Sequence, residues 1–134
     1  MNKLFTLGGW LLFLGAPGVA AAGTLFTNPV IFVSPPTLNF GPVATNAIVT
    51  NTFVVENMGR GKLVGTATVQ APFKILSGGD YTLRENEAQV ITLTYTPSGA
   101  AADTQTVQFT GGGGATATVT GKLAVAPLKK SKRR

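Results

Sequence analysis

Residues 89–95 read Gln-Val-Ile-Thr-Leu-Thr-Tyr, and apolar and polar side chains alternate through most of this stretch. Ile91, Leu93 and Tyr95 fall on one face and the two threonines on the other, which is the period of a β-strand with one buried side. Pro97 follows and ends the pattern, since proline cannot donate to a strand ladder. The stretch therefore predicts a strand whose apolar face packs into a core.

The same alternation recurs about every ten residues on both sides of this stretch. No window between residues 30 and 125 has the 3.6-residue period of an amphipathic helix. Seven or eight short strands in one domain predict an all-β fold, an antiparallel sandwich of two sheets. Besides 89–95, the expected strands cover residues 37–40, 47–57, 63–70, 73–76, 80–83, 104–110 and 115–123.

The inward positions of these strands predict a core that needs no disulfide, and the chain has no Cys. Each large apolar side chain that becomes buried contributes about 2 kcal/mol against the ordering entropy of the chain. The expected core consists of Phe40, Val49, Phe53, Val55, Leu63, Val69, Phe73, Ile75, Leu83, Ile91, Leu93, Tyr95, Val107, Phe109 and Val119.

Composition excludes several functions. The 134 residues include no His and no Cys, which excludes histidine triads, thiol nucleophiles and the usual structural zinc sites. The net charge of +6 would suggest nucleic acid or an anionic membrane as partner. Lys3 and the closing run carry this excess, however, and the five other cations balance five acidic residues, so no nucleic-acid partner is expected. The closing run contains Lys129, Lys130, Lys132, Arg133 and Arg134. It is expected to be either a solvated tail or an electrostatic contact for anionic lipid or an acidic partner.

The N-terminal residues have the three parts of a secretory signal peptide. Lys3 precedes an uncharged apolar stretch over residues 4–14, and small residues follow up to Ala22, where cleavage is expected. A retained membrane anchor is the alternative, because residues 4–22 carry no charge and are nearly long enough to span a bilayer. The predicted organisation is a leader (1–22), an apolar lead-in segment (23–33), the sandwich (34–126) and the basic tail (127–134).

Five short motifs follow one another along the chain: Ser-Pro-Pro-Thr-Leu-Asn-Phe-Gly-Pro-Val at 34–43, Val-Glu-Asn-Met-Gly at 55–59, Ala-Pro-Phe at 71–73, Gly-Gly-Asp-Tyr-Thr-Leu at 78–83 and Thr-Tyr-Thr-Pro at 94–97. In this order they resemble the ASH-type immunoglobulin-like domains of abnormal-spindle and hydin proteins, which are related to the major sperm protein sandwich. The versions in bacterial choice-of-anchor D secreted proteins are especially similar. The resemblance implies an immunoglobulin-like sandwich that acts as a scaffold or interaction module, with no catalytic residue to carry over.

Glycine, proline and asparagine predict where strands end. Gly41-Pro42 is expected to terminate the strand before it, and Pro72 to break pairing where the chain changes sheet. Asn57, with Gly59 and Gly61, is expected to supply the positive-φ positions of a tight connection.

No motif predicts a catalytic, cofactor-binding or metal-binding site. Gly59-Arg60-Gly61-Lys62 lacks the spacing of a phosphate loop and is predicted to be a turn, as is the glycine run at 111–114. Asp80, Glu85 and Glu87 lie close in sequence but without a calcium-loop pattern, and Arg84-Glu85-Asn86-Glu87 is expected to form a polar turn before the strand at 89–95. Tyr81 is the one side chain that suggests sugar stacking. Because a single aromatic side chain is weak support, carbohydrate binding is the least favoured hypothesis.

The leading functional hypothesis is a non-enzymatic interaction module, exported to the bacterial periplasm or cell surface, that binds a protein of unknown identity through a sheet edge or end loops. The uncharged lead-in segment is the expected contact, and an extra edge strand of its own domain is the alternative. A small accessory subunit of an envelope complex, held at the membrane by the leader or the tail, is the second hypothesis. The contact residues are predicted to be Leu25, Phe26, Val30, Ile31, Phe32 and Val33.

Overall fold

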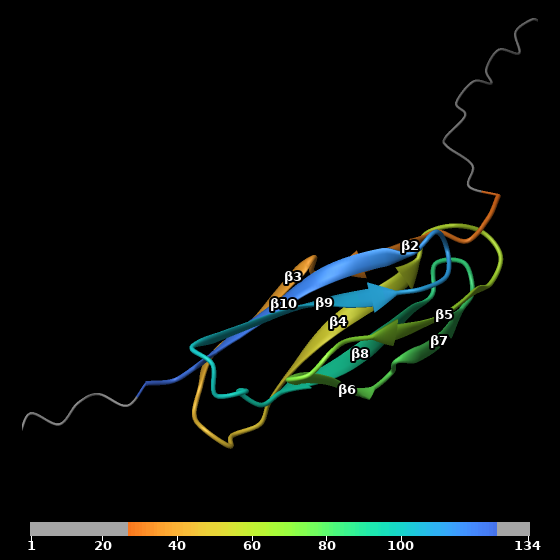
Figure 1. The fold of residues 1–134 in the computed structure, drawn as a ribbon. Coiled ribbons are helices and arrows are strands. Elements are labelled where there is room, and N and C mark those ends of the chain that lie inside the picture. Colours follow the sequence, from red (N-terminus) through yellow and green to blue (C-terminus); the bar gives the residue numbers. More distant parts are fainter. Residues whose placement is uncertain (1–26, 126–134) are drawn as a thin grey trace, which may run out of the picture.

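The computed structural model describes residues 27–125, which form two β-sheets packed face to face (Figure 1). The all-β sandwich is confirmed, with nine strands in this part of the chain where seven or eight were expected. The additional strand is β2, which lies in the lead-in segment. An extra edge strand was the alternative expected for that segment. The strands are β2 (Ile31–Ser34), β3 (Thr37–Val43), β4 (Val49–Asn57), β5 (Leu63–Thr68), β6 (Phe73–Ser77), β7 (Asp80–Leu83), β8 (Ala88–Tyr95), β9 (Ala102–Phe109) and β10 (Ala115–Leu123).

One sheet has five strands in the order β3-β10-β9-β5-β7, and the other has four in the order β2-β4-β8-β6. All neighbouring strands are antiparallel except β3 and β10, which pair in parallel from Thr37↔Thr118 to Val43↔Leu123. The expectation of a wholly antiparallel sandwich was therefore wrong for this pair. The cause is the path of the chain: it leaves β2 after pairing with β4 and crosses into the other sheet, where it meets β10 running in the same direction.

Each side of the sandwich is bridged by a segment that passes from the four-stranded to the five-stranded sheet. Pro35-Pro36 separates β2 from β3 on one side, and Gly78-Gly79 separates β6 from β7 on the other. The expected change of sheet at Pro72 is also confirmed, since β5 and β6 lie in different sheets. Three of the edge strands, β2, β6 and β7, have only four or five residues, which limits the backbone open to unwanted pairing; the fourth, β3, has seven.

The expected core is confirmed except for Val49, which is the first residue of β4, at the margin of the sheet, and remains exposed. Phe40, Phe73 and Tyr95 form an aromatic cluster, with ring centroids 5.6 Å apart for Phe40–Tyr95 and 4.7 Å for the stacked pair Phe73–Tyr95. The alternation pattern did not place Leu38, Val43, Ile31 and Tyr81 in the core, yet all four are buried there.

Two expectations about turns were wrong. Gly41-Pro42 does not end the strand, because β3 continues to Val43; Gly41 has a φ of 68°, and the irregularity is absorbed by a register shift against β10. In the β4–β5 connection only Gly61 has positive φ (79°). The Asn57 side chain makes hydrogen bonds there, and Gly59, which has no side chain, allows the backbone of residues 28–30 to approach closely.

The described chain begins at one end of the sandwich and leaves at the other (Figure 1). At the first end, Arg60 donates a backbone hydrogen bond to Asn28 (3.2 Å); at the second, Ala124 donates one to Val43 (2.8 Å). A search of residues 27–125 for a helix apolar and long enough to cross a membrane found none.

Candidate functional site: the outer face of the four-stranded sheet

The described residues of the lead-in segment, 27–33, are held against the sandwich, and the last three belong to its strand β2. Ile31 is buried in the core, and Val33 packs against it. Val30 is half-buried, whereas Phe32 is 51% exposed and points away from the core. The pairing of β2 with β4 confirms the edge-strand alternative for Ile31–Ser34. Among the predicted contact residues that the structure describes, Phe32 is the one that offers a large side chain to solvent; Leu25 and Phe26 lie outside the described residues.

The buried side chain of Asn57 fixes the position of this segment. Its Oδ1 accepts hydrogen bonds from the backbone N–H groups of Val30 (3.1 Å) and Gly59 (3.0 Å). Its Nδ2 donates to the carbonyl oxygens of Gly61 (2.9 Å) and Leu83 (3.3 Å). One amide thus joins the start of β2, the β4–β5 connection and the end of β7. Alternation patterns do not reveal this role, because they assign a polar residue at a strand end to solvent.

Apart from Val49 at the start of β4, the four-stranded sheet carries one large exposed apolar side chain on each of its strands. Val54 and Val90 are directly opposite each other on β4 and β8. Phe32 and Leu76 extend this pair diagonally: Phe32 is opposite Glu56, two residues from Val54, and Leu76 lies at the register shift near Thr92, two residues from Val90. Their exposed fractions are 51% for Phe32, 38% for Val54, 54% for Val90 and 60% for Leu76. We call these four residues the apolar stripe. The stripe crosses all four strands on one diagonal, so it is a shared feature of this face.

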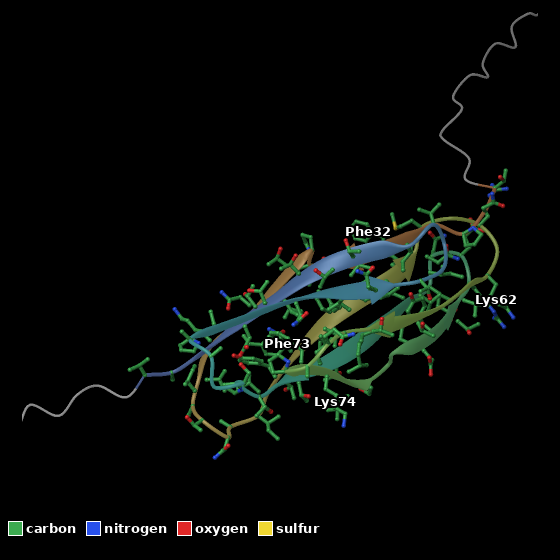
Figure 2. All side chains as sticks on the ribbon, viewed as in Figure 1. Phe32, Lys62, Phe73 and Lys74 are labelled. Atoms are coloured by element: carbon green, nitrogen blue, oxygen red, sulfur yellow. The ribbon has the colours of Figure 1, made fainter. Side chains whose placement is uncertain are left out.

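A depression of about 540 Å³ lies at the β6 end of the apolar stripe. Exposed Ile48 and Leu76 contribute apolar surface, and the Lys74 side chain comes from the same strand as Leu76. Figure 2 shows Phe32 and Lys74 at opposite margins of the molecule, on the β2 side and on the β6 side. We call this hollow the β6 depression; it is lined by Ile48, Thr50, Ala71, Pro72, Phe73, Lys74, Leu76, Thr94 and Thr96.

The outer face of the five-stranded sheet is different in character. Its outward positions are mainly threonine and glutamine, as in Thr104, Thr106 and Gln108 of β9. Among the described residues, Val64 is the one large apolar side chain of that sheet that is substantially exposed. The two outer faces therefore differ strongly, and the apolar one is the candidate for contact with a partner.

A second buried polar group, Asp103, lies near the opposite end of the sandwich. Its Oδ2 accepts hydrogen bonds from the Tyr95 hydroxyl (2.8 Å) and the Ser98 N–H (3.2 Å), and its Oδ1 from the Ser98 hydroxyl (2.5 Å). The hydrogen bond from the Ser98 hydroxyl, supported by Tyr95, holds the pKa of Asp103 below its usual value against the effect of burial. Burial and the neighbouring carboxylate raise the pKa of Tyr95 to about 12.

The surroundings of Asp103 favour a structural role. A hollow of about 180 Å³ lies beside it, lined also by Gly121 and Lys122. Both carboxylate oxygens are already engaged by Tyr95 and Ser98, so the cluster secures the β8–β9 connection.

Tyr81 cannot serve as a sugar-stacking surface, because its ring is buried in the core. Its hydroxyl donates to the carbonyl oxygen of Thr110 at 2.5 Å, and burial raises its pKa. The carbohydrate hypothesis loses the residue on which it depended.

The remaining polar motifs form turns, as expected. Glu87 accepts a hydrogen bond from the Arg84 N–H through Oε2 (2.7 Å), which closes the turn before β8. Gly111–Gly114 forms the β9–β10 turn, with the Gly114 N–H donating to the Gly111 carbonyl oxygen (2.9 Å). Within residues 27–125, no group of three or more carboxylate, His or Cys side chains is arranged to hold a metal ion. The basic tail, with Lys129, Lys130, Lys132, Arg133 and Arg134, lies outside the described residues.

No protein-family model matches the chain, and no curated protein matches it in sequence. Solved structures do match. The ASH / PapD-like domain 7 of human CEP192 has a TM-score of 0.62 at 14% identity, covering 78% of this chain and 92% of that one. A protein of unknown function from Porphyromonas gingivalis W83 has a TM-score of 0.63 at 14% identity, covering 79% and 51%. The E. coli chaperone DraB has a TM-score of 0.53 at 10% identity, covering 71% and 54%.

These likenesses establish the fold. The described residues form an immunoglobulin-like sandwich of the ASH and PapD-like kind, as the sequence resemblance implied. The chain spans about half the length of the Porphyromonas protein and of DraB. Structures that share this architecture include chaperones and an ASH domain.

Proposed function

We propose that the sandwich is a non-enzymatic protein-interaction module of an exported protein. The one-sided distribution of exposed apolar side chains carries this proposal: the apolar stripe and the β6 depression occupy one face, and the other face is polar. An exposed apolar row that crosses a whole sheet costs solubility and is typical of a contact surface. The likeness to chaperones and to an ASH domain supports the same function.

Affinity capture from the native envelope fraction tests this proposal. The tagged protein is compared with its Phe32→Ser variant, which removes the aromatic ring of the stripe but keeps β2. Val64→Ser is the matched control, because Val64 is similarly exposed but lies on the five-stranded sheet. We expect a protein captured by the native chain and by the control to be lost with Phe32→Ser; equal capture by all three would contradict the proposed surface.

Export rests on the leader-like residues 1–22, which lie outside the described part of the chain. The proposal places the mature protein in the periplasm or at the cell surface, in the manner of the secreted choice-of-anchor D proteins that the motifs resemble. N-terminal sequencing of the native protein tests it. A start at residue 23 is expected, and a start at Met1 would mean that the leader is retained.

Membrane association is the second candidate, and the cations of the closing run favour it. The described residues show no matching imbalance: the acidic residues at the end where the described chain begins are accompanied by Arg60, Lys62 and Arg84, and Lys122 at the other end lines the same hollow as Asp103. The basic tail is therefore the part of the chain that would contact an anionic surface. A salt wash of membranes tests this, because salt releases a protein held by the tail, while a retained leader requires detergent.

A further inference from the structure

We propose that the apolar stripe binds a second copy of this chain, so that two four-stranded sheets pack face to face about a two-fold axis. This inference rests on the proposed function, since it names the partner of the same surface. In a two-fold dimer each patch must be complementary to itself. The shape and the charge of this face both meet that requirement.

The shape requirement is met by a projection and a hollow at the two ends of one stripe. The half-exposed ring of Phe32 stands at the β2 end, and the β6 depression lies at the other end, beside Leu76. When two stripes are laid antiparallel, Phe32 of each copy lies over the depression of the other. Val54 and Val90 then meet their counterparts at the centre, where the twisted sheets approach each other.

The charge requirement is met by the two charged residues of the four-stranded sheet, Glu56 and Lys74. Glu56 lies directly opposite Phe32, and Lys74 is two residues from Leu76. Within one copy they are far apart, since Glu56 is paired with Ala88 and Lys74 with Thr94, six residues further along β8. Six residues of a strand span about 20 Å, too far for an ion pair. In the antiparallel arrangement, each Glu56 comes near Lys74 of the other copy.

A second copy fits this face better than an anionic membrane does. A carboxylate beside the projecting ring opposes insertion of Phe32 among anionic head groups, and the face as a whole has no net charge. Apolar residues flanked by one acid and one base at opposite ends fit a neutral surface with the reverse arrangement, which a two-fold axis supplies.

Sedimentation equilibrium of the purified full-length protein, over micromolar to submillimolar concentrations, tests the dimer. We expect a concentration-dependent monomer–dimer equilibrium. Phe32→Ser should raise the dissociation constant by about 30-fold, the effect of losing an aromatic anchor that fills a hollow in the partner. Val64→Ser on the other sheet should leave it unchanged. Circular dichroism melting checks that each variant remains folded, which is expected because the substituted side chains are solvent-exposed.

Charge reversal gives the sharper test. Glu56→Lys and Lys74→Glu should each weaken the dimer about ten-fold, because each places like charges across the interface. The double variant should recover most of the native affinity, which a general loss of stability would not produce. A protein that is monomeric throughout the concentration range, or a folded double variant no better than the single ones, would overturn the proposal.

The two proposals fail separately. If the protein is monomeric but Phe32→Ser still loses a captured envelope protein, the surface is an interaction site and the second-copy inference is wrong. If the charge-reversed pair restores a dimer but no captured protein depends on Phe32, self-association stands and the binding of another protein is refuted.

Discussion

Two buried polar side chains hold the loops at opposite ends of the sandwich. Asn57 joins the lead-in segment to the β4–β5 connection and β7, and Asp103 secures the β8–β9 connection through Ser98 and Tyr95. Buried polar groups of this kind stabilise a structure only when their hydrogen bonds are made, so losing either is costly.

Asn57→Ala should lower the free energy of unfolding by about 3 kcal/mol, because it leaves the buried N–H groups of Val30 and Gly59 without their side-chain acceptor. Urea unfolding measures the change. Asn51→Ala is the control: its side chain is exposed and accepts only from the adjacent Thr52 N–H (2.9 Å), so a change within about 0.5 kcal/mol is expected. Equal effects of the two variants would refute the role given to Asn57.

Asp103→Asn should cost about 2 kcal/mol at neutral pH, since it weakens charge-assisted hydrogen bonds in a buried site. The pKa of Asp103 is lowered in the folded protein, so its ionised form contributes stability above the pKa of the unfolded chain. That contribution disappears as pH falls through the lowered value. Unfolding free energies measured from pH 7 to pH 2 should therefore converge for native protein and variant; a constant difference would contradict this account.

At the scale of strands, the position of β2 depends on how the lead-in segment packs against the β4–β5 connection. The lead-in runs against the β4–β5 connection before β2 begins: Met58 donates to Val30 (2.9 Å) and Arg60 to Asn28 (3.2 Å). A Cβ at Gly59 would overlap the Asn28 carbonyl oxygen and the Val30 nitrogen. The glycine is therefore needed for close approach and not for its backbone angles.

Gly59→Ala should detach the lead-in locally and reduce hydrogen-exchange protection at Val30 and Ile31 more than at the centre of β8. Gly99→Ala is a contrasting control in the β8–β9 connection, because its Cβ would meet open space but its φ is 101°. That variant should lose about 1–2 kcal/mol through backbone strain alone and leave protection near Val30 unchanged relative to the rest of the sandwich. Loss of protection near Val30 in both variants would contradict the close-approach explanation.

At the scale of the whole molecule, β2 contributes to the core, to a sheet edge and to the apolar outer face. It carries Ile31 in the core, covers the edge of β4 and presents Phe32 outward. Removing the lead-in to abolish a contact would therefore also damage the fold, which is why single substitutions are preferred as tests of the surface.

Truncation tests the boundary of the folded unit. A chain beginning at Thr27 keeps every described strand and should melt within a few degrees of the native protein. A chain beginning at Pro35 loses Ile31 from the core and exposes the edge of β4, so it should be destabilised by about 3 kcal/mol or more and tend to aggregate. Equal melting temperatures for the two chains would show that β2 is dispensable.

Much of the fold and part of the candidate site were predictable from local patterns. Alternation placed residues such as Ile91, Leu93 and Val107 in the core, because each side chain of a strand faces the side opposite to its neighbours'. The same pattern predicted that Phe32 belongs to an apolar segment. It did not predict that β2 would turn Ile31 inward and leave Phe32 outside, since that depends on the pairing of β2 with β4.

The sequence by itself determined the strand periodicity, the lack of His and Cys, and the concentration of positive charge in the closing run. Only the tertiary structure decided the parallel pairing of β3 with β10, the buried roles of Asn57 and Asp103, and the alignment of the apolar stripe. The physical reason is the separation along the chain of the residues that determine each feature. A periodic pattern reports which side of a strand is buried, whereas a surface such as the stripe is assembled from strands far apart in sequence whose register is set by packing and hydrogen bonding.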